Sequence, residues 1–283
     1  MKTYFDCVPC FIRQTVEAAR IATSDEKLQE KILREVLRAV SKMNLSQSPP
    51  VMMQYLYRLI REISGSQDPY KKLKDSFNKL ALDIYPDLSD RVKKASDPFE
   101  AAVRFAIAGN IIDSGAVQNL NKSYIIETIE QAMSQKLSGN IEKLRIAINS
   151  ANKILYLGDN TGEIVFDKLL IEQLPLDRVT FVVRGYPIIN DATLIDAKIA
   201  GLTDIVEVID NGSDAPGTVL EDCSEEFIQH FSDADLIIAK GQGNYETLSN
   251  ADKIIFFILK AKCPVIARNI GCEIGSLIIK DIN

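Results

Sequence analysis

Apolar residues in the first half of the chain recur at the spacing of helices. Four stretches show this pattern, at residues 24–43, 48–64, 68–88 and 97–115. In the first stretch, Leu28, Ile32 and Val36 repeat at every fourth position, which places them on one face of a helix. Ser24 precedes them as the candidate N-cap. Because nothing before residue 150 alternates as a strand does, we predict an all-α N-terminal bundle over residues 1–95.

The pattern changes near residue 153, where short apolar runs begin to alternate with helical segments. Four runs rich in β-branched residues cover residues 153–158, 179–185, 204–210 and 234–241. Helical periodicity separates or follows them at residues 161–174, 191–202 and 244–262. Continuous apolar runs are typical of strands buried on both faces, as in a parallel sheet. We therefore predict an α/β domain over residues 96–283.

Two further apolar runs, residues 263–268 and 276–280, lie near the C-terminus. The segment between them, residues 269–275, is too short for a crossover helix. We therefore expect these two strands to pair antiparallel.

Composition narrows the functional class. The 283 residues carry a net charge of −6, which argues against a nucleic-acid or anionic-membrane surface, since either favours a basic patch. No apolar run approaches the roughly 20 residues that a membrane helix needs, and the first residues lack the apolar core of a signal peptide. Five cysteines fit a reducing compartment better than a disulfide framework. We expect a cytoplasmic protein without nucleic-acid or membrane partners, and a homo-oligomer is compatible with the sequence.

The sequence leaves little room for cysteine or histidine chemistry. His230, the single histidine, lies near the end of a predicted helix, where a surface position explains it better than catalysis. Cys7 and Cys10 form a Cys-x-x-Cys pair, but a zinc site needs four ligands and no second pair has a fitting spacing. We therefore favour structural packing for this pair over metal binding or redox chemistry.

Polar side chains and a glycine-rich turn crowd the predicted carboxyl ends of three strands, where ligands bind in open α/β sheets. They are Asp159, Asn160 and Glu163 after the first strand, Arg184 and Asp191 after the second, and Lys240, Gly243 and Asn244 at and after the fourth. Helix capping explains one side chain at each tip, but not the whole set after the first strand. Capping by Asp191 and a simple glycine turn after Lys240 stay open as alternatives. Lys240 is the least expected, because burying its charge is costly unless it is paired.

These residue types suit a metal ion and a phosphate group. Asp159, Asn160 and Asp191 supply hard oxygen ligands, which suit Mg²⁺ or Mn²⁺ better than zinc. Lys240 and glycine-rich backbone amides at a helix N-terminus suit an oxyanion, above all a phosphate. There is no P-loop, and the glycines of residues 158–163 lack the spacing of a dinucleotide site. The set therefore predicts metal-assisted phosphoryl transfer to water.

In order and spacing, four segments of the chain resemble the damage-control phosphatase family. They are residues 108–115, 157–170, 182–193 and 240–248. The resemblance covers the whole chain and is closest to archaeal and bacterial members with an N-terminal Cys-x-x-Cys. The family implies an N-terminal all-α domain followed by a Rossmann-like, three-layer α/β/α catalytic domain. Its mixed sheet has the strand order 3-2-1-4-5-6, with the last strand antiparallel.

The resemblance also implies roles for individual residues. Asp159, Asn160 and Asp191 match the metal positions of the family. The phosphate side is matched by Lys240, Gly243 and Asn244, and Gly162 and Arg184 are expected to contact substrate beside them. Asn110 and Asp113 match a segment that lines the same cleft.

We predict a metal-dependent phosphatase that hydrolyses small phosphorylated metabolites, such as sugar phosphates, and removes damaged or surplus intermediates. Its cofactor is a divalent metal: Mg²⁺, Mn²⁺, Co²⁺ or Ni²⁺. Lys240 is expected to neutralise charge in the transition state and Glu163 to orient the attacking water. Direct attack by Asp159 stays open. Two alternatives are an S-adenosylmethionine-dependent carboxyl methyltransferase on the same sheet and a non-catalytic binder of phosphorylated metabolites.

Overall fold

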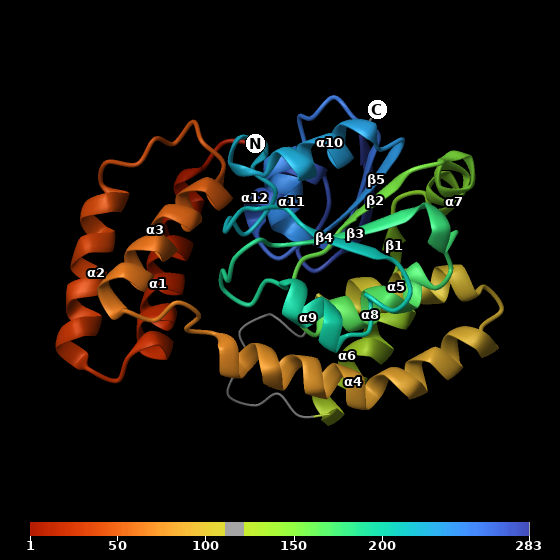
Figure 1. The fold of residues 1–283 in the computed structure, drawn as a ribbon, viewed down its shortest axis with the longest axis horizontal. Helices are drawn as coiled ribbons and strands as arrows, with labels where there is room; N and C mark the ends of the chain where they lie inside the picture. Colours follow the sequence, from red (N-terminus) through yellow and green to blue (C-terminus); the bar gives the residue numbers. More distant parts are fainter. Residues whose placement is uncertain (111–121, 283) are drawn as a thin grey trace.

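A seven-stranded mixed sheet forms the centre of the protein (Figure 1). In this computed structural model, which describes residues 1–110 and 122–282, the strands follow the order β1-β7-β6-β5-β2-β3-β4. The strands are β1 Leu137–Ser138, β2 Ile154–Leu157, β3 Val179–Val183, β4 Glu207–Asp210, β5 Leu236–Lys240, β6 Ile255–Lys260 and β7 Leu277–Ile282. Neighbouring strands run parallel except β6 and β7.

The predicted fold class is confirmed, and the strand order differs slightly from the prediction. Strands β2 to β7 lie in the expected order 3-2-1-4-5-6, and the last of them is antiparallel. The sheet differs from the prediction by one additional strand, β1, which pairs with β7 at the edge. β1 has two residues, too few for an alternating pattern to reveal it.

Two elements near the C-terminus differ from the prediction. The segment 244–262 is not one helix, because α11 (Gly241–Leu248) is followed by strand β6. The run 263–268 is not a strand, because it lies largely in α12 (Pro264–Ile270). Pro264 has no N–H for a sheet ladder, and its fixed φ suits the first turn of a helix. The strand that pairs antiparallel with β7 is therefore β6.

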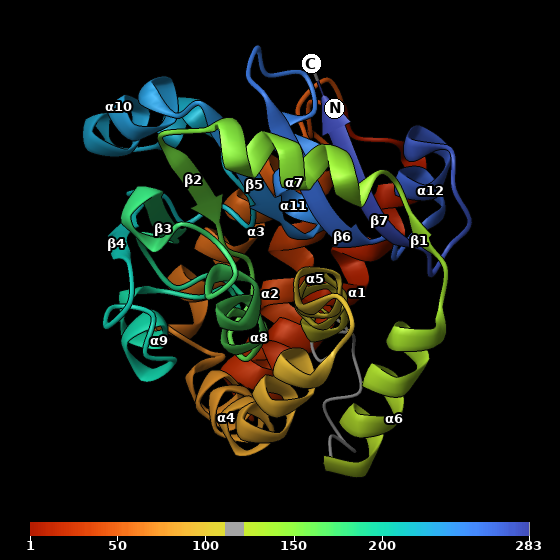
Figure 2. The same ribbon diagram turned by 90° about the vertical axis from the view of Figure 1, so that its right-hand side faces the viewer.

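Helices cover both faces of the sheet, so the domain has three layers (Figure 2). One face carries α4 Lys71–Lys94, α5 Pro98–Gly109, α7 Ile141–Ser150 and α8 Glu163–Ile171, flanked by α6 Lys122–Ser134 and α9 Leu194–Ile199. The other face carries α10 Glu225–Asp233 with α11 and α12. Each face has its own apolar core. Tyr156 and Phe181 lie in the first core, and Leu157 and Phe257 lie in the second.

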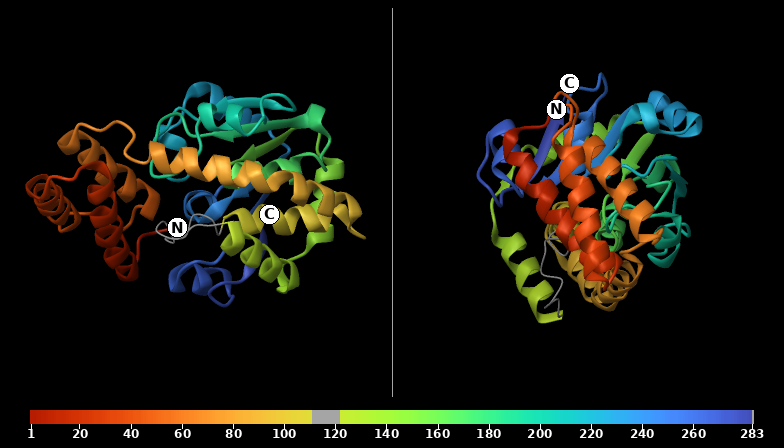
Figure 3. Two further views of the ribbon diagram at one scale, coloured as in Figure 1. Left: turned by 90° about the horizontal axis from the view of Figure 1, so that it is seen from below. Right: turned by 90° about the vertical axis from the view of Figure 1, so that its left-hand side faces the viewer.

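The first three helices form a bundle at one end of the molecule (Figure 3). They are α1 Val8–Ala22, α2 Glu26–Val40 and α3 Pro49–Ser64. Ile32 and Val36, predicted to share one helix face, are both buried in the core of the bundle. The N-cap of α2 is Asp25 and not Ser24, because the Asp25 carboxylate accepts a hydrogen bond from Lys27 N. The division into domains at residue 95 stays a prediction.

No helix in the described part of the chain is long and apolar enough to cross a membrane. The cytoplasmic location and the absence of nucleic-acid partners stay predictions.

Candidate functional site

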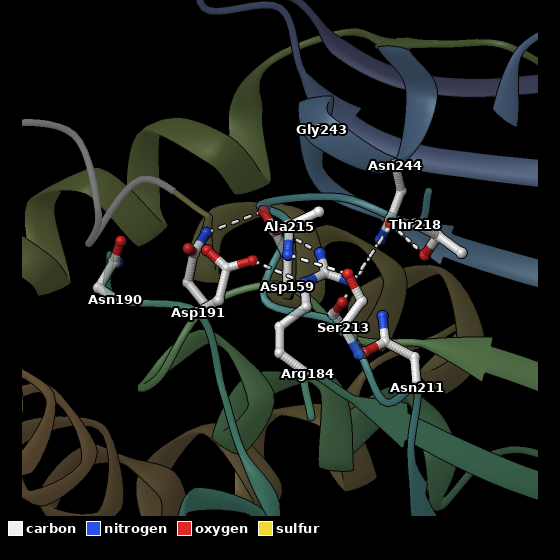
Figure 4. A network of polar contacts seen from close by, with 12 residues as sticks. Asp159, Arg184, Asn190, Asp191, Asn211, Ser213, Ala215, Thr218, Gly243 and Asn244 are labelled. Carbon is white, nitrogen blue, oxygen red and sulfur yellow. Dashed lines mark hydrogen bonds and ion pairs between the residues drawn. The ribbon is translucent and has the colours of Figure 1, made fainter. Parts of the chain in front are cut away.

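The carboxyl ends of β2, β3 and β5 meet at one edge of the sheet (Figure 4). β2 pairs in parallel with β3 on one side and with β5 on the other. This register brings Asp159, Arg184 and Lys240 to the same edge. All three are buried, with exposed fractions of 9%, 1% and 0% respectively.

The loops that follow β2 and β3 are hydrogen-bonded to each other. Asn160 and Asp191 form an isolated antiparallel bridge. Next to it, Ala192 N donates to the carbonyl oxygen of Asp159 over 2.8 Å. The structure therefore brings together Asp159, Asn160 and Asp191, which are the three predicted metal ligands. Metal binding itself stays a prediction.

Arg184 lies between the two aspartates of this group. Its Nε donates to Asp191 Oδ2 over 2.7 Å, and its Nη2 lies 3.5 Å from Asp159 Oδ1. Arg184 Nη2 has no hydrogen-bond partner among the described residues. The expected contact of Arg184 with substrate stays a prediction. What the structure shows is a buried cation that holds two carboxylates close together.

The carboxyl group of Asp159 lies in an environment that disfavours its charge. Burial raises the pKa of Asp159 well above its usual range. The carboxylates of Asp191 and Glu163 raise the pKa further. The cations of Arg184 and Lys262 act in the opposite direction without cancelling the shift. A further positive charge beside Asp159 would lower its pKa and stabilise the ionised form.

Glu163, the first residue of α8, is fully buried. Its carboxylate accepts hydrogen bonds from Lys240 Nζ (2.8 Å), Asn110 Nδ2 (2.7 Å) and Asn160 Nδ2 (3.0 Å). Burial opposes its ionisation, but the charge and the hydrogen bonds of its partners outweigh burial and lower the pKa of Glu163. Glu163 is therefore a charged group that fixes the side-chain amides around Asp159.

Lys240 lies beneath this cluster. Its Nζ donates to Ala106 O over 2.9 Å, to Glu163 Oε1 and to Asp167 Oδ1. Burial acts to lower the pKa of Lys240, but the two carboxylates more than offset it, so the pKa is raised. An ammonium group has three donors, and here each has a protein acceptor. The expected direct contact of Lys240 with a phosphate does not agree with this geometry.

Asp167 belongs to the same network, although it is not among the site residues predicted from the sequence. It is fully buried, and its Oδ1 also accepts a hydrogen bond from the Tyr156 hydroxyl over 2.9 Å. Burial raises the pKa of Asp167 to about 7, against the attraction of Lys240. A sequence signal was present: Asp167 follows Glu163 by four positions, so two carboxylates share one face of a largely apolar helix.

Two asparagines that were expected to contact substrate hold other residues in place. Asn110 Nδ2 donates to Asp159 Oδ2 over 3.2 Å, while its Oδ1 has no partner among the described residues. Asn244 Nδ2 donates to Lys240 O over 2.8 Å, and Asn244 Oδ1 accepts from the Thr218 hydroxyl. Both asparagines are fully buried. Asp113 lies outside the described residues.

The glycines of the predicted phosphate cradle have structural reasons of their own. Gly162 has a φ of 73°, and its N–H donates to Asn78 Oδ1 over 2.9 Å. A Cβ atom on Gly243 would lie 2.1 Å from Pro216 O. The backbone conformation thus explains Gly162, and close packing explains Gly243. Their contact with substrate stays a prediction.

A cleft of about 1470 Å³ opens over the site. Asp159, Asn160, Asp191 and Gly243 line it on the side of the sheet. The bundle supplies much of the rest through α1 and α3, with Phe11, Arg13, Arg20, Met53 and Tyr57. A phosphorylated organic molecule would therefore meet residues from both the sheet edge and the helices.

The two cysteines of the Cys-x-x-Cys pair line this cleft. Cys7 and Cys10 come from the start of α1, and Cys263 joins them from the residue before α12. All three are free thiols. Burial raises the pKa of Cys7, so its thiolate form is disfavoured. This environment is consistent with the structural role preferred from the sequence.

Metal binding at this site depends on a mixed set of ligands. In residues 1–110 and 122–282, no group of three or more histidine, cysteine, aspartate or glutamate side chains is arranged as a ready-made metal centre. The predicted set is different, because the amide of Asn160 accompanies the carboxylates of Asp159 and Asp191. Two carboxylates and an amide oxygen suit a hard divalent cation. The charge-disfavouring environment of Asp159 also favours a bound cation, so the residues fit the predicted group.

Comparison with known proteins agrees with this description. The protein-family model of the damage-control phosphatase ARMT1-like domain matches residues 3–278 of the sequence. An uncharacterized protein of Methanocaldococcus jannaschii is 42% identical, with 97% of this chain and 93% of that protein covered. A damage-control phosphatase of Archaeoglobus fulgidus is 34% identical, with 97% of each chain covered. The crystal structure of a DUF89 family protein from Pyrococcus horikoshii superposes with a TM-score of 0.91 at 33% identity, covering 100% of both chains.

Proposed function

The chain belongs to the damage-control phosphatase ARMT1-like family, and on that premise we propose that it is a divalent-metal-dependent phosphatase of small phosphorylated metabolites. The family and the relatives named above support a phosphatase-type role in metabolite damage control. The need for a metal and the choice of substrates, with sugar phosphates among them, are our proposals.

The balance of buried charge is the observation that carries this proposal. Four buried carboxylates belong to the connected network: Asp159 and Asp191, which line the cleft, and Glu163 and Asp167, which lie beneath them. Two buried cations face them, Arg184 and Lys240. When all six groups are ionised, two negative charges are in excess, and the partly exposed Lys262 offsets only part of this. Uncompensated buried charge is unfavourable, and a divalent cation would offset it.

The residues placed to hold that cation are Asp159, Asn160 and Asp191, which line the cleft. When bound there, a divalent metal would polarise the phosphoryl group and lower the pKa of a water molecule. Asn160 Nδ2 donates to Asp159 Oδ2 over 2.9 Å and to Glu163 Oε2 over 3.0 Å. Because these two carboxylates occupy Nδ2 of Asn160, its Oδ1 points to the opposite side of the amide.

The deeper residues orient this group and do not contact substrate. Lys240 fixes Glu163, and Glu163 fixes the amides of Asn110 and Asn160. Arg184 keeps the carboxylates of the two aspartates close together despite their repulsion. Because these polar groups are already oriented, they do not have to reorient when charge develops in the reaction.

The lining of the cleft supports an organic phosphate as the substrate. Its volume of about 1470 Å³ exceeds the space that inorganic phosphate needs. Phe11 and Met53 give it apolar surface, and Arg13 and Arg20 give it positive charge on the side of α1. A molecule with a carbon skeleton and one or more anionic groups matches this lining.

A metal-dependence screen tests the proposal. The full chain is treated with EDTA, and Mg²⁺, Mn²⁺, Co²⁺ or Ni²⁺ is added with each of a panel of phosphorylated metabolites. We expect phosphate release that requires the metal and includes at least one sugar phosphate. The Asp159→Ala variant, folded as judged by circular dichroism, serves as the inactive control.

Three results would contradict the proposal. Full phosphate release in EDTA would remove the role of the metal. Binding of phosphorylated metabolites without release in any metal would favour the non-catalytic binder. Micromolar binding of S-adenosylmethionine in calorimetry would favour the methyltransferase.

A further inference from the structure

The segment that carries Asp191 turns sharply at Ile189. Ile189 has a φ of 45° and is the one residue other than glycine with a positive φ in the described part of the chain. A β-branched side chain in this region clashes with the neighbouring backbone. Such a conformation persists only where the surroundings hold it in place. Figure 4 shows the adjacent Asn190 and Asp191 at the edge of the site.

The helical bundle supplies the holding contacts. Ile188 is 2% exposed and lies in the apolar core formed by α1, α2 and α3, and Ile189 packs against the same core. On the polar side, Arg61 of α3 donates from Nη1 to Pro187 O over 2.6 Å. The turn is therefore fixed by an apolar contact and by a charged donor, both of which come from outside the sheet.

Arg61 is itself fixed by a second loop. Its Nη2 forms an ion pair with Asp214, which lies after β4 and is buried. Arg58, one helical turn earlier, also pairs with Asp214, at 2.5 Å, but its side chain is 50% exposed. Of the two arginines, Arg61 is the one that reaches the turn at Pro187.

The other side of the turn contacts the proposed cation site. Asp191 N donates to Ile188 O over 3.0 Å. The N–H and the hydroxyl of Thr161 both donate to Asn190 O, over 2.9 and 3.0 Å. The conformation of the turn thus sets where Asp191 lies relative to the loop that carries Asn160.

We propose that the helical bundle, through Arg61 and Ile188, holds this strained turn and thereby positions Asp191 for the cation. Arg61 is a positioning residue, because it acts through its contacts with Pro187 O and Asp214 and is not among the residues that line the cleft. The inference rests on the proposed function for the identity of the ligand, a divalent cation. Its structural part, the order of the turn, is measurable without any metal.

A matched pair of arginine variants tests the inference. Arg61→Met removes the donor to Pro187 O together with an ion pair to Asp214. Arg58→Met removes ion pairs to Asp214 and Asp222 and leaves the donor to Pro187 O in place. Mn²⁺ affinity is measured by calorimetry without substrate, and amide exchange of residues 187–192 is measured by mass spectrometry without metal. Losing a charged hydrogen bond predicts roughly tenfold weaker Mn²⁺ binding in Arg61→Met, with faster exchange of the turn. Arg58→Met changes neither quantity by more than about twofold.

Wild-type affinity and wild-type exchange in Arg61→Met would overturn the inference, as would equal changes in both variants. If the wild type binds no Mn²⁺, the proposed function fails, and the exchange measurement alone then decides the inference. If Arg61→Met does not fold, Ile188→Val takes its place, because it removes one methyl group from the same anchor. Exchange at residues 187–192 that is unchanged in Ile188→Val overturns the inference, and faster exchange confined to this turn supports it.

Discussion

Gly241 lies so close to Asp159 that a Cβ atom on the glycine would come within 1.9 Å of Asp159 Oδ2. Gly241 is the first residue of α11 and has a φ of 76°. The backbone of Gly241, directly after β5, therefore packs against the carboxylate of Asp159, which follows β2. No side-chain atom at position 241 fits between them, so the position of the Asp159 carboxylate depends on a glycine there.

Gly241→Ala should displace the Asp159 carboxylate and reduce kcat/KM by roughly a hundredfold, since small misplacements at a reacting centre are costly. Gly65→Ala is the matched control, because Gly65 has a φ of 73° and no atom within 4 Å of the added Cβ. Both variants carry the backbone strain, but only Gly241→Ala crowds the site. Similar kcat/KM values for the two variants, each measured with excess Mn²⁺, would show that the close approach to Asp159 has no functional role.

Lys240→Met should unfold far more easily than the wild type. The substitution leaves Glu163 and Asp167 buried without their cation. Breaking a buried ion pair from one side costs about 3–5 kcal/mol, which urea denaturation at pH 7 can measure. Adding Asp167→Asn to Lys240→Met should recover part of the loss, because one of the two orphaned charges is then removed.

Lys153→Met is the control for this experiment. Lys153 pairs with Asp233 over 2.9 Å, but both side chains are largely exposed. An exposed pair of this kind contributes little to stability, because water and salt screen it. Equal losses in Lys240→Met and Lys153→Met would mean that the buried network does not stabilise the fold.

Much of the site could be predicted because parallel strands bring their carboxyl ends to one edge. Asp159, Asn160 and Asp191 were placed together on that basis, and the structure brings them together. The partner of Lys240 was harder to foresee. It depends on the rotation of α8 about its axis, which points Glu163 and Asp167 inward and is set by packing against the sheet.

Other features had no usable signal in the local sequence. The apolar run that forms β6 fits a buried helix as well as a strand, and neighbouring strands decide between them. The positive φ of Ile189 contradicts the preference of a β-branched residue, so only tertiary contacts produce it. The contact between Gly241 and Asp159 joins residues far apart in the chain.

The stability of the wild type relative to Asp167→Asn should fall as the pH rises from about 4 to about 7. The folded protein raises the pKa of Asp167 to about 7 from its unfolded value of 3.8. In that window the folded state holds a proton that the unfolded state has released, so raising the pH favours unfolding. Asp167→Asn removes this titration and keeps a side-chain oxygen to accept from Lys240 and Tyr156.

Urea denaturation of both proteins at half-unit pH intervals gives the difference in the free energy of unfolding. The difference should level off above about pH 7, where Asp167 is ionised in both states. A difference that stays constant from pH 4 to pH 8 would show that Asp167 does not titrate in this range.

Asp159→Asn should make the metal-free protein more stable and its response to metal weaker. The raised pKa of Asp159 means that its charge destabilises the folded state above the unfolded pKa. Replacing the carboxylate by an amide removes that charge, and a tenfold change in an acid dissociation constant corresponds to about 1.4 kcal/mol. The Tm of Asp159→Asn in EDTA at pH 7.5 should therefore exceed that of the wild type.

Mn²⁺ should reverse this order. Tighter binding to the folded state gives a larger rise in Tm, and Asp159→Asn lacks one anionic ligand of a hard cation. The wild type should gain several degrees in millimolar Mn²⁺, and Asp159→Asn should gain less and recover activity only at higher metal concentration. Asp177→Asn, at an exposed position, is the control and should match the wild type in both conditions. If Asp159→Asn is less stable than the wild type in EDTA and gains as much from Mn²⁺, Asp159 is neither electrostatically strained nor a metal ligand.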